Sequence, residues 1–426
     1  MRPDLAFRSG RDKRAANEPD LIRRHRPDYL IVVFMVFLMM LGLVVLYSIN
    51  PALNRSYESS FIGKQVLFLF LGLGVFFIAS RIPLSFLQKI APVVLAGSII
   101  LGFLMALLSL LPGTPLVYCY NGACRWLDLG IASFQPAELM KLAILLYLAV
   151  FLAARMREGT LQDPKRTLLP VGIAVGLLSL IVIVIQKDMG SGLIILAVSA
   201  VMLYVAQLKM KYFLAALGVL VGAGLLFIVT APHRMERIFT FFNHSNATDA
   251  SNYHIEQALI AVGSGGFFGQ GLAHGIQAFG YLPEAANDSI FAIVAEIFGF
   301  TGTVAILAIF GALIYRLLVT LDRSRRPEFQ LIMAGVVAWV GSHIVINIAA
   351  MIGLVPLTGI TLPFLSFGGT SLLFIMFIMG IAFNISHYTD HKNSIAKKES
   401  DTDENRRGGR GVRRPRHASS SRYQRA

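Results

Sequence analysis

The first apolar segment of the chain reads YLIVVFMVFLMMLGLVVLYSI, from Tyr29 to Ile49, and contains no charged side chain. A hydrocarbon core about 30 Å thick is crossed by roughly 20 helical residues, because each residue rises about 1.5 Å along the helix axis. The segment is therefore long enough to span a membrane. It is too long for a cleavable signal, and no small-residue cleavage site follows it.

Further apolar runs of similar character follow along the whole chain. A soluble domain could not keep ten such runs wetted, and their continuous apolar pattern excludes the alternating strands of a membrane barrel. The sequence therefore predicts an all-α membrane protein, a bundle of ten transmembrane helices. The nine runs after the first are Phe61–Ala79, Ile90–Leu111, Leu139–Ala154, Leu168–Ile185, Ser191–Val205, Tyr212–Thr230, Ile290–Leu318, Leu331–Met351 and Ser366–Ile385.

The net charge of +14 could indicate a nucleic-acid partner, but the distribution of the basic residues argues against one. If the N-terminus lies inside and ten spans alternate, the inside segments hold 31 of the 38 Lys and Arg residues, and the outside segments hold six. This asymmetry is the positive-inside rule of membrane proteins. It predicts a multi-pass protein of the bacterial cytoplasmic (inner) membrane with both termini in the cytoplasm and no nucleic-acid partner.

The chain divides into a membrane domain, residues 28–387, and two polar tails. Residues 1–27 and 388–426 have the composition of disordered cytoplasmic tails, and the second is strongly basic. The basic tail could contact anionic membrane lipids, or it could serve only as a solvated topology signal. Two outside loops are long: Pro112–Glu138, and Ala231–Ser289 between the seventh and eighth spans. We expect the apolar part of the second, His254 to Gly280, to pack on the membrane domain.

The two cysteines of the chain, Cys119 and Cys124, fall in the first of these outside loops. An oxidising compartment would allow them to form a local disulfide, and the alternative is a pair of free thiols.

Ionisable residues in or beside the spans are candidates for function, because charge is costly in a membrane. Each also has a structural alternative, such as an ion pair or a helix cap. All of them are predicted to lie in the outer half of the membrane, where cations oppose the positive-inside trend and favour an anionic partner. They are Arg125, Glu138, Lys141, Lys187, Asp188, Arg234, Arg237, Asp288 and Glu296. His343 and Asn347 share one face of the ninth span and are expected to form interhelical hydrogen bonds.

Several strings extend this interpretation. They are RWLDLGIASFQPAELMKLA from Arg125, QKDMGSG from Gln186, QALIAVGSGGFFGQGL from Gln257, YLPEAANDSIFAIVAE from Tyr281 and GLVPLTGITLPFLSFGGTS from Gly353. With these strings in this order, the chain resembles the SEDS (shape, elongation, division and sporulation) family, typified by FtsW and RodA. The resemblance covers about residues 26–387.

The resemblance implies a peptidoglycan glycosyltransferase that polymerises lipid II at the outer face of the membrane. It also implies a partner, a class B penicillin-binding protein (a transpeptidase), together with other division proteins. The family's essential carboxylate falls on Asp288, and its intramembrane acid–base pair falls on Glu138 and Lys141. The sequence departs from the family where Ala286-Asn287 precedes the Asp, and again at Lys187, Met189 and Ser191.

These implied roles agree with the chemistry of the residues. Asp288 is placed as the general base that takes the proton of the attacking sugar hydroxyl. The diphosphate leaving group requires cations, and no cofactor is certain, although a divalent cation, Mg²⁺ or Mn²⁺, is compatible with the reaction. The metal ligands are unknown. The predicted substrate-binding residues are Arg125, Glu138, Lys141, Lys187, Asp188, Arg234 and Arg237.

Three other functions compete with septal glycan polymerisation. A RodA-type polymerase for elongation and cell shape would use the same residues, and the string Pro356-Leu357-Thr358-Gly359 resembles that type equally well. A lipid II flippase or transporter would need a charged path to the inner leaflet, whereas the charges here gather outward. A scaffold without activity would not depend on Asp288. The long basic tails favour the FtsW-type role in division.

Overall fold

The computed structural model describes residues 26–49, 55–109, 117–120, 123–128, 133–216, 250–272, 274–277 and 280–389, with the single positions 218 and 222. Arg234, Arg237 and most of both predicted tails lie outside these residues. So does most of the seventh predicted span, residues 212–230.

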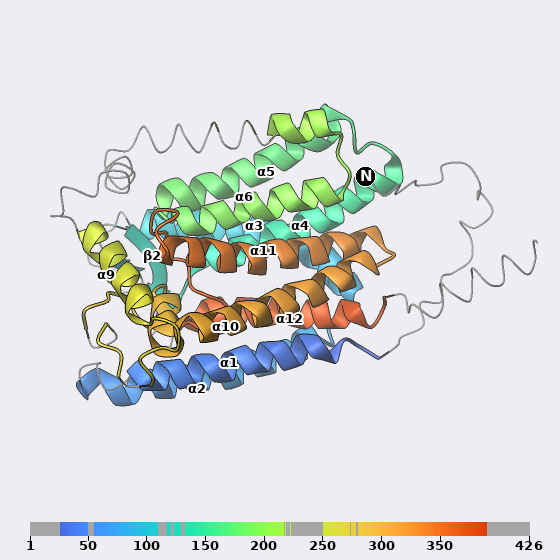
Figure 1. Ribbon diagram of the computed structural model, residues 1–426. Coiled ribbons are helices and arrows are strands. Elements are labelled where there is room, and N and C mark those ends of the chain that lie inside the picture. Colours follow the sequence, from blue (N-terminus) through green and yellow to red (C-terminus); the bar gives the residue numbers. More distant parts are fainter. Residues whose placement is uncertain are drawn as a thin grey trace, which may run out of the picture.

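The described chain is a bundle of long helices that run side by side (Figure 1). The π-helical turns η3 and η4 flank α5, so that these three elements form one continuous crossing. The helices and their bounds are α1 (Tyr29–Ile49), α2 (Arg55–Ala79), α3 (Leu84–Ser109), α4 (Pro136–Glu158), η3 (Pro164–Leu168), α5 (Leu169–Leu180), η4 (Ile181–Ile185), α6 (Met189–Val205), α9 (Ala250–Ser264), α10 (Ile290–Asp322), α11 (Pro327–Met351) and α12 (Gly369–Ser386).

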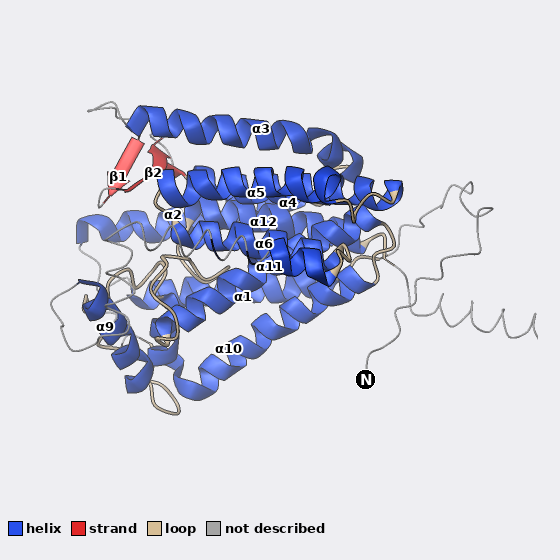
Figure 2. Cartoon of the chain, turned by 90° about the horizontal axis from the view of Figure 1, so that it is seen from above, coloured by secondary structure: helices blue, strands red, loops and turns tan. Residues whose placement is uncertain are grey.

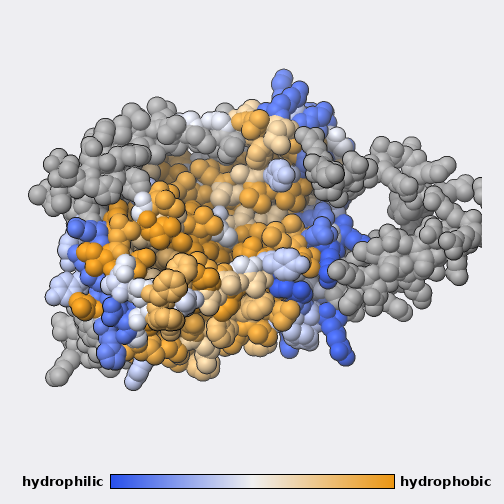
Figure 3. All heavy atoms as spheres, viewed as in Figure 1, coloured by the Kyte–Doolittle hydropathy of each residue, from blue (hydrophilic) through white to orange (hydrophobic). Residues whose placement is uncertain are grey.

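The predicted helical membrane protein is confirmed. Within the described residues, eight helices are long and apolar enough to cross a membrane, and α6 is a shorter apolar helix. These nine match nine of the ten predicted runs. A broad hydrophobic belt lies between two hydrophilic ends on the face shown in Figure 3, as expected of a protein embedded in lipid.

The helices differ in how much of their surface lies inside the bundle. About 72% of the apolar window of α4 is buried and 67% of that of α11, whereas α2 and α3 bury only 22% each. Helices α4, α6 and α11 pack against one another at the centre, and α3 forms an outer layer beside α4 (Figure 2). The polar residues on the central helices are therefore shielded from lipid, which is the condition for a site inside a membrane.

The described part of the loop predicted at residues 112–138 contains three short strands, which an all-α prediction did not include. Strands β1 (Val117–Tyr120), β2 (Ala123–Asp128) and β3 (Ser133–Phe134) form an antiparallel sheet in the order β1-β2-β3. Cys119 lies opposite Cys124 in the strand register, and Cys124 is disulfide-bonded. Because the chain has no third cysteine, the bridge closes the β1–β2 hairpin.

Helix α10 is broken at Gly299, whose φ of 66° and ψ of −167° are not helical. The loop after α9 supplies partners for the backbone groups that the break releases. Gln270 N–H donates to the carbonyl of Glu296 at 2.8 Å, and Phe300 N–H donates to the carbonyl of Gly266 at 2.9 Å. A Cβ on Gly265 would lie 2.0 Å from the Ala295 carbonyl oxygen, so only glycine permits this approach. The described part of residues 254–280 therefore packs on the membrane domain, as predicted.

At the opposite end of the bundle, the start of α1 is tied to two later helices. The Asp28 carboxylate accepts a hydrogen bond from Arg316 Nε of α10 at 2.7 Å, and Asp28 N–H donates to Ser386 Oγ of α12 at 3.1 Å. Helix α12 also packs closely along α2, where a Cβ on Gly380 would lie 2.5 Å from the Phe76 carbonyl oxygen. The first two helices of the bundle are thus held by the last.

Candidate functional site

Asp288 lies two residues before α10, at the end of the bundle that also holds β2 and α9 (Figure 1). Its side chain is buried, and Oδ1 finds no hydrogen-bond partner among the described residues. Asn347 Nδ2 of α11 donates to the Asp288 backbone carbonyl at 2.6 Å. One oxygen each of Glu138, Glu296 and Glu328 is also buried without a partner, so this feature alone does not single out Asp288. Such an oxygen can accept a hydrogen bond from a ligand.

The turn before Asp288 is shaped by its own hydrogen bonds. Glu284 adopts a positive φ of 51°, and Asn287 Nδ2 donates to Glu284 Oε2 at 2.5 Å. Ser289 Oγ donates to the Pro283 carbonyl at 2.9 Å, and His254 Nε2 of α9 lies 2.6 Å from the same hydroxyl. Helix α9 is therefore joined by a side chain to the turn that carries Asp288.

Burial raises the pKa of the Asp288 carboxyl to about 7, and the negative charge of Glu284 adds to the rise. A carboxyl with such a pKa exchanges its proton readily near neutral pH. This property is typical of a general base or acid rather than of a structural carboxylate.

Glu138 and Lys141 form a fully buried ion pair in the first turns of α4. Glu138 is 3% exposed and Lys141 is 1% exposed, and Lys141 Nζ lies 2.7 Å from Glu138 Oε1. Pro136 at the start of α4 and the acidic Glu138 in its first turn both suit a helix N-terminus. The ammonium also faces the Trp339 ring of α11, 5.2 Å from the ring centroid. The pair thus neutralises its charges within the protein.

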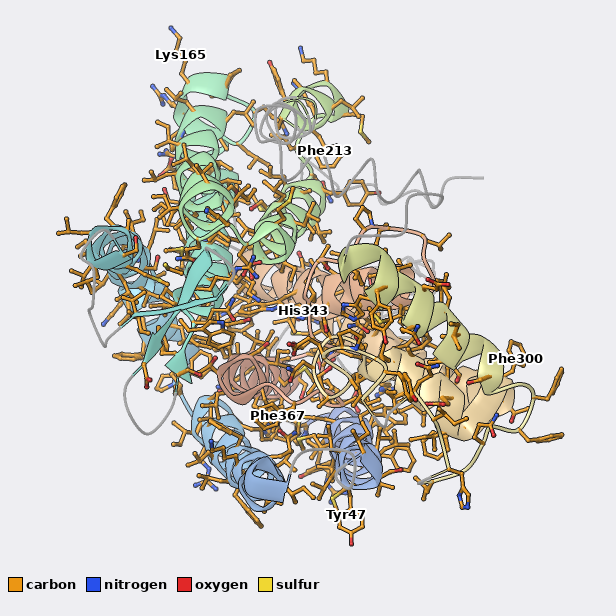
Figure 4. All side chains as sticks on the ribbon, turned by 90° about the vertical axis from the view of Figure 1, so that its left-hand side faces the viewer. Tyr47, Lys165, Phe213, Phe300, His343 and Phe367 are labelled. Atoms are coloured by element: carbon orange, nitrogen blue, oxygen red, sulfur yellow. The ribbon has the colours of Figure 1, made fainter. Side chains whose placement is uncertain are left out.

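Residues 357–362, which follow α11, are called the returning segment here. The segment contacts His343 and Asn347 of α11 and passes close to Asp288. His343 Nδ1 contacts the Thr361 carbonyl at 3.1 Å, and Asn347 Nδ2 donates to the Ile360 carbonyl at 2.7 Å. A Cβ on Gly359 would lie 4.0 Å from Asp288 Oδ2. Seen along the bundle, His343 sits near the centre of the molecule (Figure 4).

Residues 186–188 form a junction between β2, α4 and α6. Asp188 caps α6 by accepting from Ser191 N–H at 3.0 Å, and it also accepts from Gln135 Nε2 at 2.9 Å. Arg125 donates to the backbone carbonyls of Lys187 at 2.6 Å and Gln186 at 3.3 Å. Arg125 and Asp188, which we predicted as substrate ligands, therefore have structural partners. Gln186 is fully buried, and neither polar atom of its side chain is hydrogen-bonded within the described residues.

The comparisons with known proteins agree on one family. A family model described as a cell cycle protein, covering FtsW, RodA and SpoVE, matches residues 28–391. This chain belongs to that family. Stage V sporulation protein E of Bacillus subtilis is 32% identical over 372 residues, which cover 86% of this chain and 99% of that protein. A protein of Coxiella burnetii named probable peptidoglycan glycosyltransferase FtsW is also 32% identical, over 85% of this chain and 97% of its own length.

Solved structures show the same FtsW/RodA/SpoVE fold. The rod shape determining protein RodA of Thermus thermophilus matches with a TM-score of 0.60 and 25% identity, over 86% of this chain and 98% of that one. A chain from a structure described as a peptidoglycan synthase complex that coordinates polymerization and crosslinking matches with a TM-score of 0.67 and 24% identity, over 85% and 99%.

In this member of the FtsW/RodA/SpoVE family, Lys141 is connected to residues 360–361 through His343, and the Asp288 backbone is connected to them through Asn347. Glu296 is also buried, but its Oε1 accepts Gln277 N–H at 3.0 Å and holds the loop beside α10. No group of three His, Cys, Asp or Glu side chains suited to a metal ion gathers within the described ranges. Sequence reasoning assigned no site role to Gln135 or Gln186, because it searched for ionisable residues in and beside the spans.

Proposed function

We propose that this FtsW/RodA/SpoVE protein is a peptidoglycan glycosyltransferase that polymerises lipid II, with Asp288 as its general base. The observation that carries the proposal is the buried Asp288 carboxylate, with one unpartnered oxygen and a pKa of about 7. Several relatives named probable peptidoglycan glycosyltransferase FtsW support the reaction class. Purified protein with its transpeptidase partner should extend labelled lipid II into glycan strands, and a sample that binds lipid II without extending it would contradict the proposal.

In the proposed reaction, Asp288 takes the proton of the acceptor's sugar hydroxyl as the oxygen attacks the donor's anomeric carbon. The bond from that carbon to the diphosphate breaks as the new glycosidic bond forms, and the configuration inverts. The leaving diphosphate requires positive charge, for which we propose Lys187, Arg234 and Arg237. A divalent cation, Mg²⁺ or Mn²⁺, would add charge neutralisation at the diphosphate, but no three His, Cys, Asp or Glu side chains gather to hold one within the described part of the chain.

The rate of polymerisation should rise with pH through a midpoint near 7, because only the ionised form of Asp288 can accept a proton. Below that pH the carboxyl is protonated, and activity is lost. Replacing Glu284 with glutamine removes the like charge that helps to raise the pKa of Asp288, so we expect the midpoint to move to lower pH. Measured pH–rate profiles test this, with Glu256→Gln on the exposed surface of α9 as the control. A midpoint that is equal in Glu284→Gln and Glu256→Gln would contradict the assignment.

We further propose that the partner is a class B penicillin-binding protein. A structure of similar fold, described as a peptidoglycan synthase complex that coordinates polymerization and crosslinking, supports a crosslinking partner. The candidate surface is the outer end of α10 and α11 with the loop after α9, where Phe268 is 83% exposed and Phe267 packs against Phe300. A photocrosslinker at Phe268 should capture the transpeptidase. The same probe at Phe70, 70% exposed on α2, is the control, and capture at Phe70 but not at Phe268 would place the interface elsewhere.

The orientation proposed for the membrane domain places α9, the sheet and Asp288 outside, and both termini inside. It rests on the positive-inside count, which assigns 31 of 38 basic residues to the cytoplasm. A reporter that is active only in the periplasm should be silent when fused after Tyr388, and it should be active when inserted between β1 and β2. The opposite pattern would invert the topology.

We favour septal synthesis during division over elongation, since several similar proteins are named FtsW. A tagged copy should then gather at the division site, whereas a signal spread along the side wall would favour the elongation role.

A further inference from the structure

Two side chains of α11, His343 and Asn347, lie one helical turn apart on the same buried face. Both contact the backbone of the returning segment at successive residues. His343 Nδ1 lies 3.1 Å from the Thr361 carbonyl oxygen, and Asn347 Nδ2 lies 2.7 Å from that of Ile360. Helix α11 therefore holds this segment at two adjacent carbonyl groups.

The proton arrangement on His343 follows from its neighbours. Trp339 Nε1–H donates to His343 Nε2 at 3.2 Å, and Lys141 Nζ lies 3.3 Å from the same nitrogen. A ring nitrogen that faces two N–H donors must be the acceptor, so the proton lies on Nδ1 and is donated to Thr361. The neutral imidazole thus links the Lys141 ammonium to the segment.

Asn347 makes the corresponding link to Asp288. Its amide has two N–H groups, and Nδ2 is bonded both to the Ile360 carbonyl at 2.7 Å and to the Asp288 carbonyl at 2.6 Å. The side chain is almost fully buried, so its removal would leave two carbonyl groups without this donor and without access to water.

We propose that His343 and Asn347 are positioning residues that fix the Glu138–Lys141 pair and Asp288 relative to each other through the backbone of residues 360–361. The proposal rests on the proposed function, because it concerns how that site keeps its shape. The continuous path runs from Glu138 through Lys141 and His343 to the segment, and from there through Asn347 to Asp288. Neither positioning residue bonds the Asp288 carboxylate, so each acts through another group.

The main test replaces Asn347 with alanine in the full-length protein with its transpeptidase. A displacement of Asp288 by a fraction of an ångström to 1 Å should lower the kcat for labelled lipid II by about 10- to 100-fold. Asn384 provides a matched control, because it is also buried and donates from α12 to a backbone carbonyl, that of Ile82, at 2.7 Å. Asn384→Ala should lower thermal stability by a similar amount and leave kcat near the wild-type value.

The pH–rate profile separates positioning from a general loss of folded protein. Asp288 is faced by Glu284 on its own turn and by His254 of α9 through Ser289, and Glu138, Lys141 and His343 lie beyond the 360–361 backbone. Loosening the turn admits water to the carboxyl and lowers the pKa of Asp288. The midpoint should therefore move to lower pH in Asn347→Ala, whereas a smaller folded fraction would scale the rate and leave the midpoint unchanged.

Two polar variants of His343 test the connection from Lys141 to Thr361. This test is independent of whether Asn347→Ala folds. His343→Asn keeps a donor near Thr361 but loses the contact with Lys141. His343→Gln places an acceptor near Lys141 and Trp339 but loses the bond to Thr361. Each should lower kcat by about tenfold or more with little change in KM, since neither bond touches substrate. If each retains wild-type kcat and midpoint, the path through His343 is wrong.

The outcomes distinguish this proposal from the proposed function. If Asp288→Asn is inactive while Asn347→Ala matches Asn384→Ala in rate and midpoint, the positioning role is wrong and the polymerase assignment stands. If Asp288→Asn retains activity, Asp288 is not the general base, and the proposed function is wrong independently of the positioning role.

Discussion

Replacing Asp288 with asparagine should reduce the rate of glycan polymerisation by about 10²- to 10⁴-fold, the range typical of general base catalysis. Asparagine has nearly the same shape but cannot accept a proton at neutral pH. The Asn347 bond to residue 288 involves the backbone carbonyl, so it survives the substitution. The measurement is extension of labelled lipid II by the purified complex.

The same sample should bind its transpeptidase normally and melt in detergent at or above the wild-type temperature. A neutral side chain removes the cost of burying a charge at a position that has no partner for Oδ1 within the described residues. Lost activity with retained stability identifies a chemical role. Near-wild-type polymer from Asp288→Asn would remove this carboxylate from the mechanism.

Replacing Glu138 with glutamine should destabilise the membrane domain by about 3–5 kcal/mol, the cost of leaving one charge of a buried ion pair uncompensated. Lys141 is 1% exposed and cannot reach water. His343 is its other hydrogen-bonding neighbour and carries no negative charge. Thermal unfolding in detergent, followed with and without the transpeptidase, measures the loss.

The same helix offers a matched control for this variant. Arg155 and Glu158 are also three residues apart on α4 and also pair at 2.7 Å, but Arg155 is 27% exposed and Glu158 is 53% exposed. Glu158→Gln should cost only about 0–1 kcal/mol, because water screens an exposed pair. The double variant Glu138→Leu, Lys141→Met should be more stable than Glu138→Gln, because it leaves no unpaired buried charge. It should remain inactive in glycan polymerisation. Equal melting of Glu138→Gln and Glu158→Gln would contradict a stabilising role for the buried pair.

The helices could be predicted from the sequence because a continuous apolar run has one stable solution in lipid. Their ends were less accurate, since polar residues continue a helix beyond the hydrocarbon. Helix α3 begins at Leu84, before Lys89, and α4 begins at Pro136, where the hydropathy is still low. The strands of the β1–β3 sheet are too short to leave a periodic signal.

The candidate site was predicted in part. Asp288 and the Glu138–Lys141 pair could be found because charge is rare near a membrane span. Their connection could not, because it runs through backbone carbonyls at positions 360 and 361, and any residue has a carbonyl. The interhelical bonds predicted for Asn347 are instead bonds to loops, one of them 59 residues away in sequence. The backbone bond of Arg125 to the Lys187 carbonyl could not be predicted for the same reason, and its role as a substrate ligand stays a prediction.

The bonds of Asp28 to α10 and α12 have a consequence for biosynthesis. Asp28 and Ser386 are separated by 358 residues, and a ribosome that adds roughly 5–20 residues per second needs on the order of 20 to 70 s to make that length. During this interval α1 and α2 are already in the bilayer, while α12, which later packs against α2, has not yet left the ribosome. The surface of α2 that later receives α12 must therefore tolerate lipid. The apolar part of α2, Val66 to Ala79, allows this, because hydrocarbon chains can occupy the place that α12 fills in the finished protein.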